Sequence, residues 1–267
     1  MPIVSAIILF AIVLGCVLAD LICKKDPSYL DLMNYTKAPI AEFWFGTDTL
    51  GRDMFSCIWH GGRASLLIGL ASTALSTVIA IVYGAISGIA GEKVDTLLMR
   101  FTEIILSIPN LLLIIFLQAI MGKATIGSIS VVIGLTSWFG IAKIIRTEVR
   151  QLRSSEYVIA AKCMGGSFWH ILWKHLAPNF VSSIMFMVVM NIRSAIVAES
   201  TLSFLGIGLP LEVISWGSML SLAENALMTK AWWIILIPGV FLVTVLMCIT
   251  NLGHWLQTRV SHQEAKL

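Results

Sequence analysis

Long apolar runs separated by short polar stretches are the feature that most constrains this sequence. Six runs are each long enough for a membrane helix of about 20 residues, and we place them at Pro2–Ile22, Leu66–Ala90, Phe101–Met121, Ile126–Ile145, Ser183–Leu205 and Ala231–Leu252. A transmembrane β-barrel would instead show alternating residues in segments of about 10. The sequence therefore predicts an all-α polytopic membrane protein with six transmembrane helices.

The composition excludes several other classes of protein. Of the 267 residues, 58% are hydrophobic and only 12% are charged, and the mean hydropathy is +0.90. An ordinary soluble domain is about a quarter charged, so a soluble enzyme and a disordered region are both excluded. The net charge of +3 gives no reason to expect a nucleic-acid partner. The 5 cysteines form no CxxC pair, so neither a disulfide framework nor a zinc site is indicated.

The positions of Lys and Arg predict the orientation in the membrane. With the N-terminus inside, ten of these residues fall in loops on one side and seven on the other. Cytoplasmic loops carry the excess, so both termini and the basic loop between the fourth and fifth spans are predicted to be cytoplasmic. The first span lacks a positive leading region, so we expect a retained helix rather than a signal peptide. The chain then divides into a first helix (1–22), an external segment (23–65), a core of five helices (66–256) and a tail (257–267).

Small residues in the second span predict how the helices pack. Every fourth position carries one, namely Ser72, Ser76, Ala80, Gly84 and Gly88. Membrane helices associate through such faces because their backbones can approach closely. Pro109 and Pro238 lie in the third and sixth spans; each either kinks its helix or is a plain packing feature, which is our default expectation.

Sequence signatures of catalysis and of phosphate binding are missing. There is no GxxxxGK[ST] phosphate loop, no HExxH pair and no glycine-flanked serine. His170 and His175 are five residues apart, which is about 140° around a helix, so they do not share a metal-binding face. We therefore predict no catalytic residue, no metal site, no bound cofactor and no enzymatic activity for this chain.

The basic loop between the fourth and fifth spans reads as two short helices. We expect them at Ser155–Met164 and Ser167–Leu176, with a break at Gly165 and with Pro178 ending the second helix. Periodicity alone leaves two interpretations open. The pair either lies on the membrane surface as amphipathic helices or forms a docking element for a soluble partner.

The residues of this loop resemble the EAA loop of ABC-importer permeases. The match comprises Ala160 and Ala161, then Gly165, then Pro178, while Ile159 occupies the position of the family's glutamate. The resemblance implies a cytoplasmic coupling loop at 146–182 that fits a groove on an ATPase subunit. Glu156 is a possible substitute for the missing glutamate. The coupling residues that the resemblance implies are Glu156, Tyr157, Ala160, Ala161, Gly165, His175 and Pro178.

Two further segments resemble the dipeptide, oligopeptide and nickel permeases. The first, Phe45–Asp53, resembles the GTDxxGRD motif, and the second, Leu202–Gly208 with Ser215–Leu220, resembles LSFLGLG followed by SWGxML. The resemblance is to the second ("C") permease of a pair and implies the type I ABC importer permease fold (MetI-like). The external motif residues that it marks are Gly46, Thr47, Asp48, Gly51, Arg52, Asp53 and Trp216.

The resemblance also implies partners and a mechanism. A second homologous permease would complete the pore, two ATP-binding subunits would hold ATP and Mg, and an external substrate-binding protein would deliver the ligand. The assembly would lie in the bacterial cytoplasmic (inner) membrane and import peptides or nickel and other metal chelates. The alternative is a self-sufficient secondary transporter or channel for a small solute, which would predict inverted repeats.

Several charged and aromatic residues carry more specific hypotheses. Arg193 and Glu199 lie inside the fifth span, where a charge is costly, so both are candidates for the translocation path. The alternatives are that Arg193 pairs with a carboxylate such as Glu103 and that Glu199 is structural. Asp48 and Arg52 would form a helix-surface pair worth about 0.2–0.5 kcal/mol. The stretch 53–60 is expected to be a short interfacial helix, and Trp216 either an interfacial anchor or a contact for the binding protein.

Overall fold

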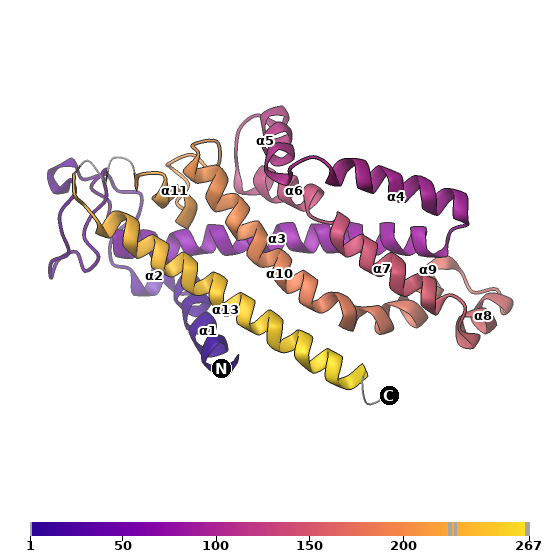
Figure 1. The fold of residues 1–267 in the computed structure, drawn as a ribbon. Coiled ribbons are helices and arrows are strands. Elements are labelled where there is room, and N and C mark those ends of the chain that lie inside the picture. The colour runs from indigo at the N-terminus through magenta and orange to yellow at the C-terminus, as the bar shows by residue number, and fades with distance from the viewer. Residues whose placement is uncertain (1, 224–225, 227–228, 265–267) are drawn as a thin grey trace.

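The computed structural model describes residues 2–223, 226 and 229–264, and every regular element in this part is a helix. Figure 1 shows how these helices are arranged. The elements that form the bundle are α1 (Pro2–Val17), α3 (Met54–Ile89), α4 (Glu92–Leu106), α5 (Asn110–Met121), α6 (Ile126–Thr136), α7 (Phe139–Leu152), α10 (Ala177–Phe204) and α13 (Trp233–Glu264). The shorter elements are α2 (Ala19–Ile22), η1 (Leu32–Asn34), α8 (Glu156–Cys163), α9 (Phe168–Ile171), η2 (Leu172–Leu176) and α11 (Trp216–Leu220).

The six predicted spans correspond to helices of three kinds. Among the described residues, α3, α10 and α13 each contain a single stretch long and apolar enough to cross a membrane. The third and fourth spans are instead bent pairs, in which α4 and α5 meet at 90° and α6 and α7 at 44°. The first span begins with α1, a shorter apolar helix of 16 residues. The all-helical membrane fold is thus confirmed, with three to five spans by this test.

Pro109 explains why the third predicted span is not one helix. It has no N–H to donate and disfavours the α conformation at Ile108. The chain therefore leaves α4 after Leu106 and begins α5 at Asn110, directly after Pro109. The default expectation of a plain packing role is wrong for Pro109, whereas Pro238 lies inside the continuous helix α13.

Helix α3 is the central element of the bundle and packs mainly against α6, α7 and α10, whereas α13 packs mainly against α10 and α1 (Figure 1). Helix α3 begins at Met54, so the short interfacial helix predicted at 53–60 is instead its first turns. Asp53 is the N-cap, because its Oδ2 accepts from the N–H of Ser56 at 2.9 Å. Cys57 and Ile58 are completely buried in these turns, which is why the segment packs in the bundle instead of lying at an interface.

The stripe of small residues on α3 packs as predicted, and all five of its members are buried. A Cβ atom added at Gly84 would lie 2.6 Å from the carbonyl oxygen of Ala142 on α7. One added at Gly88 would lie 2.7 Å from Val149 on the same helix. On α10, Asn191 Nδ2 donates to Ser76 Oγ at 2.6 Å. The stripe therefore lets α3 approach two other helices closely.

One buried carboxylate connects three helices at the end of the bundle where α8 lies. Asp95 of α4, only 4% exposed, accepts from Arg146 Nε at 2.7 Å and from Arg150 Nη1 at 2.7 Å, both on α7. The hydroxyl of Ser87 on α3 donates to the same carboxylate at 2.6 Å. The Asp95 carboxylate thus joins three helices, and the two arginines compensate its charge.

Candidate functional site

The proposed coupling loop is ordered by an ordinary helix-ending motif. Helix α8 ends at Cys163, and Gly165 then takes a φ of +79°, which favours glycine. The N–H of Gly166 donates to the carbonyl of Ala161 at 2.9 Å, the long bond of a Schellman motif. The predicted break at Gly165 is therefore confirmed, and the predicted first helix agrees with α8 within one residue at each end.

The second helix of the loop does not end at Pro178, contrary to the prediction. Helix α9 continues through the π-helical turn η2, in which the N–H of Ala177 donates to the carbonyl of Leu172, and directly into α10. Pro178 lies in the first turn of α10, where its missing N–H costs little. The chain is consequently helical without interruption from Phe168 to Phe204, a length of about 55 Å at 1.5 Å per residue.

The inward face of the loop belongs to the bundle core. Its buried side chains join Ile145 and Val149 of α7 in one hydrophobic cluster; they are Val158, Ala161, Ile171, Leu172 and Leu176. One apolar face of the loop is therefore packed against protein, and the two interpretations of the loop, membrane surface or docking element, concern its exposed side.

The exposed surface of the loop includes several large apolar side chains from both of its helices. It carries Tyr157, Ile159, Met164, Trp169 and Trp173, all at least 43% exposed. Of the coupling residues that the sequence predicts, Glu156, Tyr157, Ala160 and Gly165 are exposed and Ala161 is buried. The side chains of His175 and Pro178 lie outside the described part.

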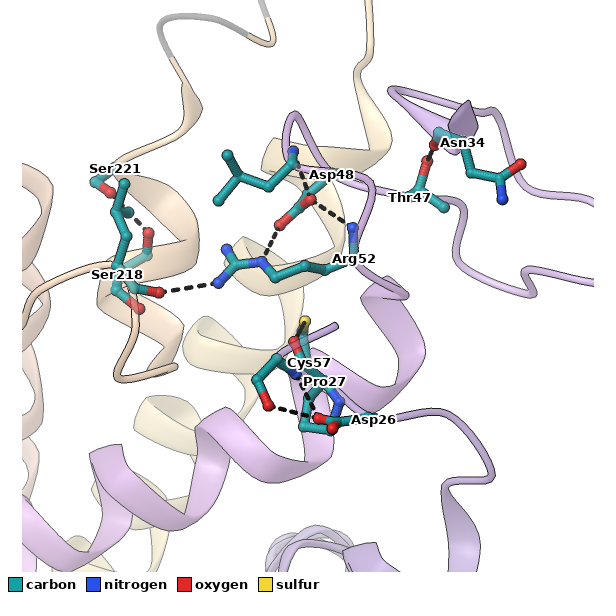
Figure 2. A network of polar contacts seen from close by, with 12 residues as sticks. Asp26, Pro27, Asn34, Thr47, Asp48, Arg52, Cys57, Ser218 and Ser221 are labelled. Atoms are coloured by element: carbon teal, nitrogen blue, oxygen red, sulfur yellow. Dashed lines mark hydrogen bonds and ion pairs between the residues drawn. The ribbon is translucent and has the colours of Figure 1, made fainter. Parts of the chain in front are cut away.

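The opposite end of the bundle carries the GTDxxGRD-like motif, which closes a compact turn (Figure 2). Asp48 Oδ1 accepts from the N–H groups of Leu50 and Arg52 at 2.8 and 2.9 Å. Gly46 and Gly51 have φ values of +75° and +77°, so both set turns. A Cβ at Gly51 would lie only 1.8 Å from the carbonyl oxygen of Asp31, so no other residue fits there.

Asp48 and Arg52 form a buried ion pair, not the exposed helical pair that their spacing suggested. Arg52 Nε donates to Asp48 Oδ2 at 2.7 Å, and the two side chains are 4% and 2% exposed. The second arm of Arg52 donates from Nη1 to the carbonyl of Leu211 at 2.9 Å. The pair thus joins the external segment to the connection between α10 and α11 (Figure 2).

Trp233 and Cys57 fasten the segment before α3 to the bundle, and Trp216 joins α11 to α3. Trp233 of α13 donates from Nε1 to the carbonyl of Thr47 at 3.0 Å, and Cys57 Sγ donates to the carbonyl of Pro27 at 3.6 Å. Next to Pro27, the hydroxyl and N–H of Ser28 donate to Asp26 and lower the pKa of that carboxyl. Trp216 is completely buried and donates to the carbonyl of Ile58 at 3.0 Å.

The burial of Trp216 corrects both sequence-based interpretations of it. Gly62 on α3 has no side chain, and a Cβ there would lie 2.7 Å from the Trp216 indole. The indole therefore fills the space beside the α3 backbone and contacts neither lipid headgroups nor an external protein in this conformation.

Comparison with known proteins identifies the family. Residues 80–262 match the family described as "Binding-protein-dependent transport system inner membrane component". The chain belongs to this family. It is 36% identical to the oligopeptide transport system permease protein OppC of Bacillus subtilis over 94% of this chain and 80% of that protein. It is also 36% identical to the dipeptide transport system permease protein DppC of the same organism, over 82% of this chain and 68% of that protein.

A solved structure confirms the fold of the permease. An inward facing conformation of the MetNI methionine ABC transporter superposes with a TM-score of 0.58 at 17% identity. The match covers 78% of this chain and 97% of that chain. At this identity the likeness concerns the fold alone, and it agrees with the expected MetI-like permease architecture.

Arg193 lies at an exposed position on α10 of the permease. Among the described residues it forms no ion pair, and Glu103, its suggested partner, instead accepts from Arg100 Nη1 at 3.3 Å. The alternative of a pair between Arg193 and Glu103 is therefore not what the structure shows. A role for Arg193 in the translocation path stays a prediction.

Glu199 occupies the opposite kind of environment on the same helix. Its side chain has no exposed surface, and Ser215 and Ser203 donate to Oε1 at 2.7 and 3.0 Å. The structural alternative fits this position, whereas nothing in this conformation opens Glu199 to a path. The recurrence of serine after Glu199, at 200, 203 and 215, was a signal that sequence reasoning overlooked.

Proposed function

We propose that this permease is one of two homologous pore subunits of an ATP-driven importer of peptides. The family description supports dependence on an external binding protein. The two relatives described above carry the names of oligopeptide and dipeptide systems, which favours peptides over nickel or metal chelates. ATP and Mg are held by separate ATPase subunits, because the sequence carries no phosphate-binding loop.

The observation that carries the proposal is the set of exposed apolar side chains on the coupling loop, whose second helix is continuous with α10. Exposed apolar patches on soluble surfaces mark interaction sites, and Met164 at 82% and Trp173 at 56% exposure are large examples. Trp169 and Trp173 lie on the continuous helix that reaches Phe204. An ATPase bound to this face therefore moves α10 whenever it moves the loop, which is the kind of two-state coupling that importers require.

The proposal also implies which end of the bundle faces the cytoplasm. The coupling loop, with the basic residues of α7, lies on the cytoplasmic side together with both termini. The GTDxxGRD-like turn and α11 lie at the other end of α3 in Figure 1, and so face the external binding protein.

The test is copurification of the ATPase subunits with tagged permease variants. Met164→Glu places a carboxylate in the proposed contact, and burying an unpaired charge costs several kcal/mol. We expect the recovery of ATPase to fall by about tenfold or more, the equivalent of about 1.4 kcal/mol. Met33→Glu is the matched control, because Met33 is 90% exposed in η1 at the external end. Full recovery with Met164→Glu would contradict the coupling role of this surface.

Peptide uptake is tested separately with the assembled importer. The complex is reconstituted in proteoliposomes with its binding protein, and ATP-dependent accumulation of labelled di- and oligopeptides is compared with that of a nickel chelate. Accumulation of the peptides alone is the expected result. Uptake without ATP or without the binding protein would favour a secondary transporter.

A further inference from the structure

Glu199 lies at the centre of four serines that come from three parts of the chain. Ser65 belongs to α3, Ser200 and Ser203 to α10, and Ser215 is the N-cap of α11. All four hydroxyls lie within hydrogen-bond distance of the Glu199 carboxyl group. No Lys, Arg or His among the described residues forms an ion pair with it. Burying a carboxyl group without a cationic partner is costly, which indicates a role for Glu199 beyond packing.

The hydrogen bonds around three of these serines have a defined direction. The hydroxyl of Ser65 accepts from the N–H of Trp216 at 3.2 Å, that of Ser203 from Leu209 at 3.2 Å, and that of Ser215 from Ser218 at 2.9 Å. Because each hydroxyl has one proton and has already accepted a bond, that proton is free to point at the carboxyl group.

The three serines therefore act as relays from backbone amides to Glu199. Ser65 donates to Oε2 at 3.2 Å, and Ser203 and Ser215 donate to Oε1 at 3.0 and 2.7 Å. Chains of this kind polarise one another and strengthen toward a negative acceptor. An ionised carboxylate, which is an acceptor only, can take all three of these protons.

Every amide at the start of these chains belongs to one stretch, which we call the α11 segment (residues 205–222). Glycines bring its backbone against α10. A Cβ at Gly217 would lie 2.6 Å from Ser200 Cα and 3.0 Å from Glu199 Oε1, and a Cβ at Gly208 would lie 2.4 Å from Ser203. The α11 segment is thus fixed by contacts that all converge on the Glu199 carboxylate.

We propose that Glu199 is a positioning residue whose negative charge holds the α11 segment closed on the outer ends of α3 and α10. The statement that this end is external rests on the proposed function. The α11 segment includes Ile207 and Leu211, which are 41% and 42% exposed at that end, so its position determines the surface offered to the external binding protein. Glu199 acts on transport through this surface and does not touch the ligand.

The direct test measures how readily the α11 segment opens. Met219, only 2% exposed within α11, is replaced by cysteine in the complete importer, with Cys23→Ser to remove the partly exposed external thiol. A membrane-impermeant maleimide then reports the exposure of that position. With Glu199→Gln, which keeps the shape and removes the charge, we expect labelling to be about tenfold faster, as for a loss of about 1.4 kcal/mol.

Serine variants keep the test decisive if Glu199→Gln fails to assemble. Ser203→Ala and Ser215→Ala each remove one relay and are expected to speed labelling severalfold. Ser200→Ala is the matched control, because its hydroxyl donates to Glu199 at 3.4 Å and receives none of the three amide bonds. Labelling at the unaltered rate in Glu199→Gln, or in both relay variants, would overturn the proposal, as would equal acceleration by Ser200→Ala.

A kinetic measurement separates positioning from general damage. We expect Glu199→Gln to raise, by severalfold, the binding-protein concentration that half-maximally stimulates ATP hydrolysis, with the rate at saturation nearly unchanged. A misfolded permease would instead lower the saturated rate at an unchanged half-saturating concentration, and that result would also overturn the proposal. Failure of wild-type importer to take up peptides would contradict the proposed function without affecting the labelling result.

Discussion

Arg52 Nε lies 2.7 Å from Asp48 Oδ2, and both side chains are almost completely buried. Removing one partner of a buried ion pair leaves a charge without compensation and costs about 3–5 kcal/mol. We therefore expect Asp48→Asn to lower markedly the thermal midpoint of the detergent-solubilised chain. The double variant Asp48→Asn/Arg52→Met leaves no buried charge, and its midpoint should lie above that of Asp48→Asn. If the midpoint of the double variant falls by the sum of the decreases in the two single variants, Asp48 and Arg52 do not act as a coupled pair.

The second prediction is that a side chain at Gly51, in the turn before α3, displaces the external segment. In Gly51→Ala the new methyl group would lie 1.8 Å from the carbonyl oxygen of Asp31, so the external segment has to move. Gly122→Ala is the matched control, because Gly122 has a similar φ of +76° and nothing within 4 Å of its would-be Cβ. Limited proteolysis of the external segment should therefore be much faster in Gly51→Ala than in Gly122→Ala, and equal rates would refute the crowding at Gly51.

The contact between α3 and α7 predicts opposite signs for two glycine substitutions. Gly84→Ala forces a methyl group against the Ala142 carbonyl oxygen, whereas Gly239 in α13 has nothing within 4 Å. In an open helical position, alanine is better than glycine by about 0.5–1 kcal/mol. The thermal midpoint should fall in Gly84→Ala and stay the same or rise in Gly239→Ala. A rise in both variants would show that α3 and α7 are not closely packed at Gly84.

The ion pairs of Asp95 with Arg146 and Arg150 should contribute more to thermal stability than an exposed ion pair does. Asp95→Asn removes the negative charge that Arg146 and Arg150 share on a residue that is only 4% exposed, so we expect a clear loss of thermal stability. The exposed pair of Arg100 with Glu103 spans 3.3 Å, and such pairs are worth about 0–1 kcal/mol. Arg100→Gln should therefore melt close to the unaltered chain. Equal losses in the two variants would mean that Asp95 has no special role.

Patterns that repeat along a helix could be predicted from the sequence. The small residues from Ser72 to Gly88 recur every fourth position, and a helix necessarily brings them to one face. The Gly165 break was predictable for a similar reason, because glycine after an apolar run is a local signal that needs no partner to act.

Features that depend on distant residues could not be predicted. The spacing of Asp48 and Arg52 fits a helix, but the positive φ of Gly51 between them makes a turn. Trp216 carries the amphipathic character of an interfacial residue, yet it is buried because Gly62, far away in sequence, makes room for its indole. Pro178 lies in the first turn of α10 instead of ending a helix, since the π-helical turn before it joins α9 to α10.

The central claim is that the coupling loop binds an ATPase subunit, and a native residue makes the test direct. Cys163 is an exposed thiol at the end of α8, whereas Cys16, Cys57 and Cys248 are buried. With Cys23→Ser, a short photo-crosslinker attached to Cys163 in the assembled importer should capture the ATPase subunit in good yield. The same crosslinker at Lys123→Cys, in the loop between α5 and α6, should not. Capture of the ATPase from Lys123→Cys but not from Cys163 would contradict the account.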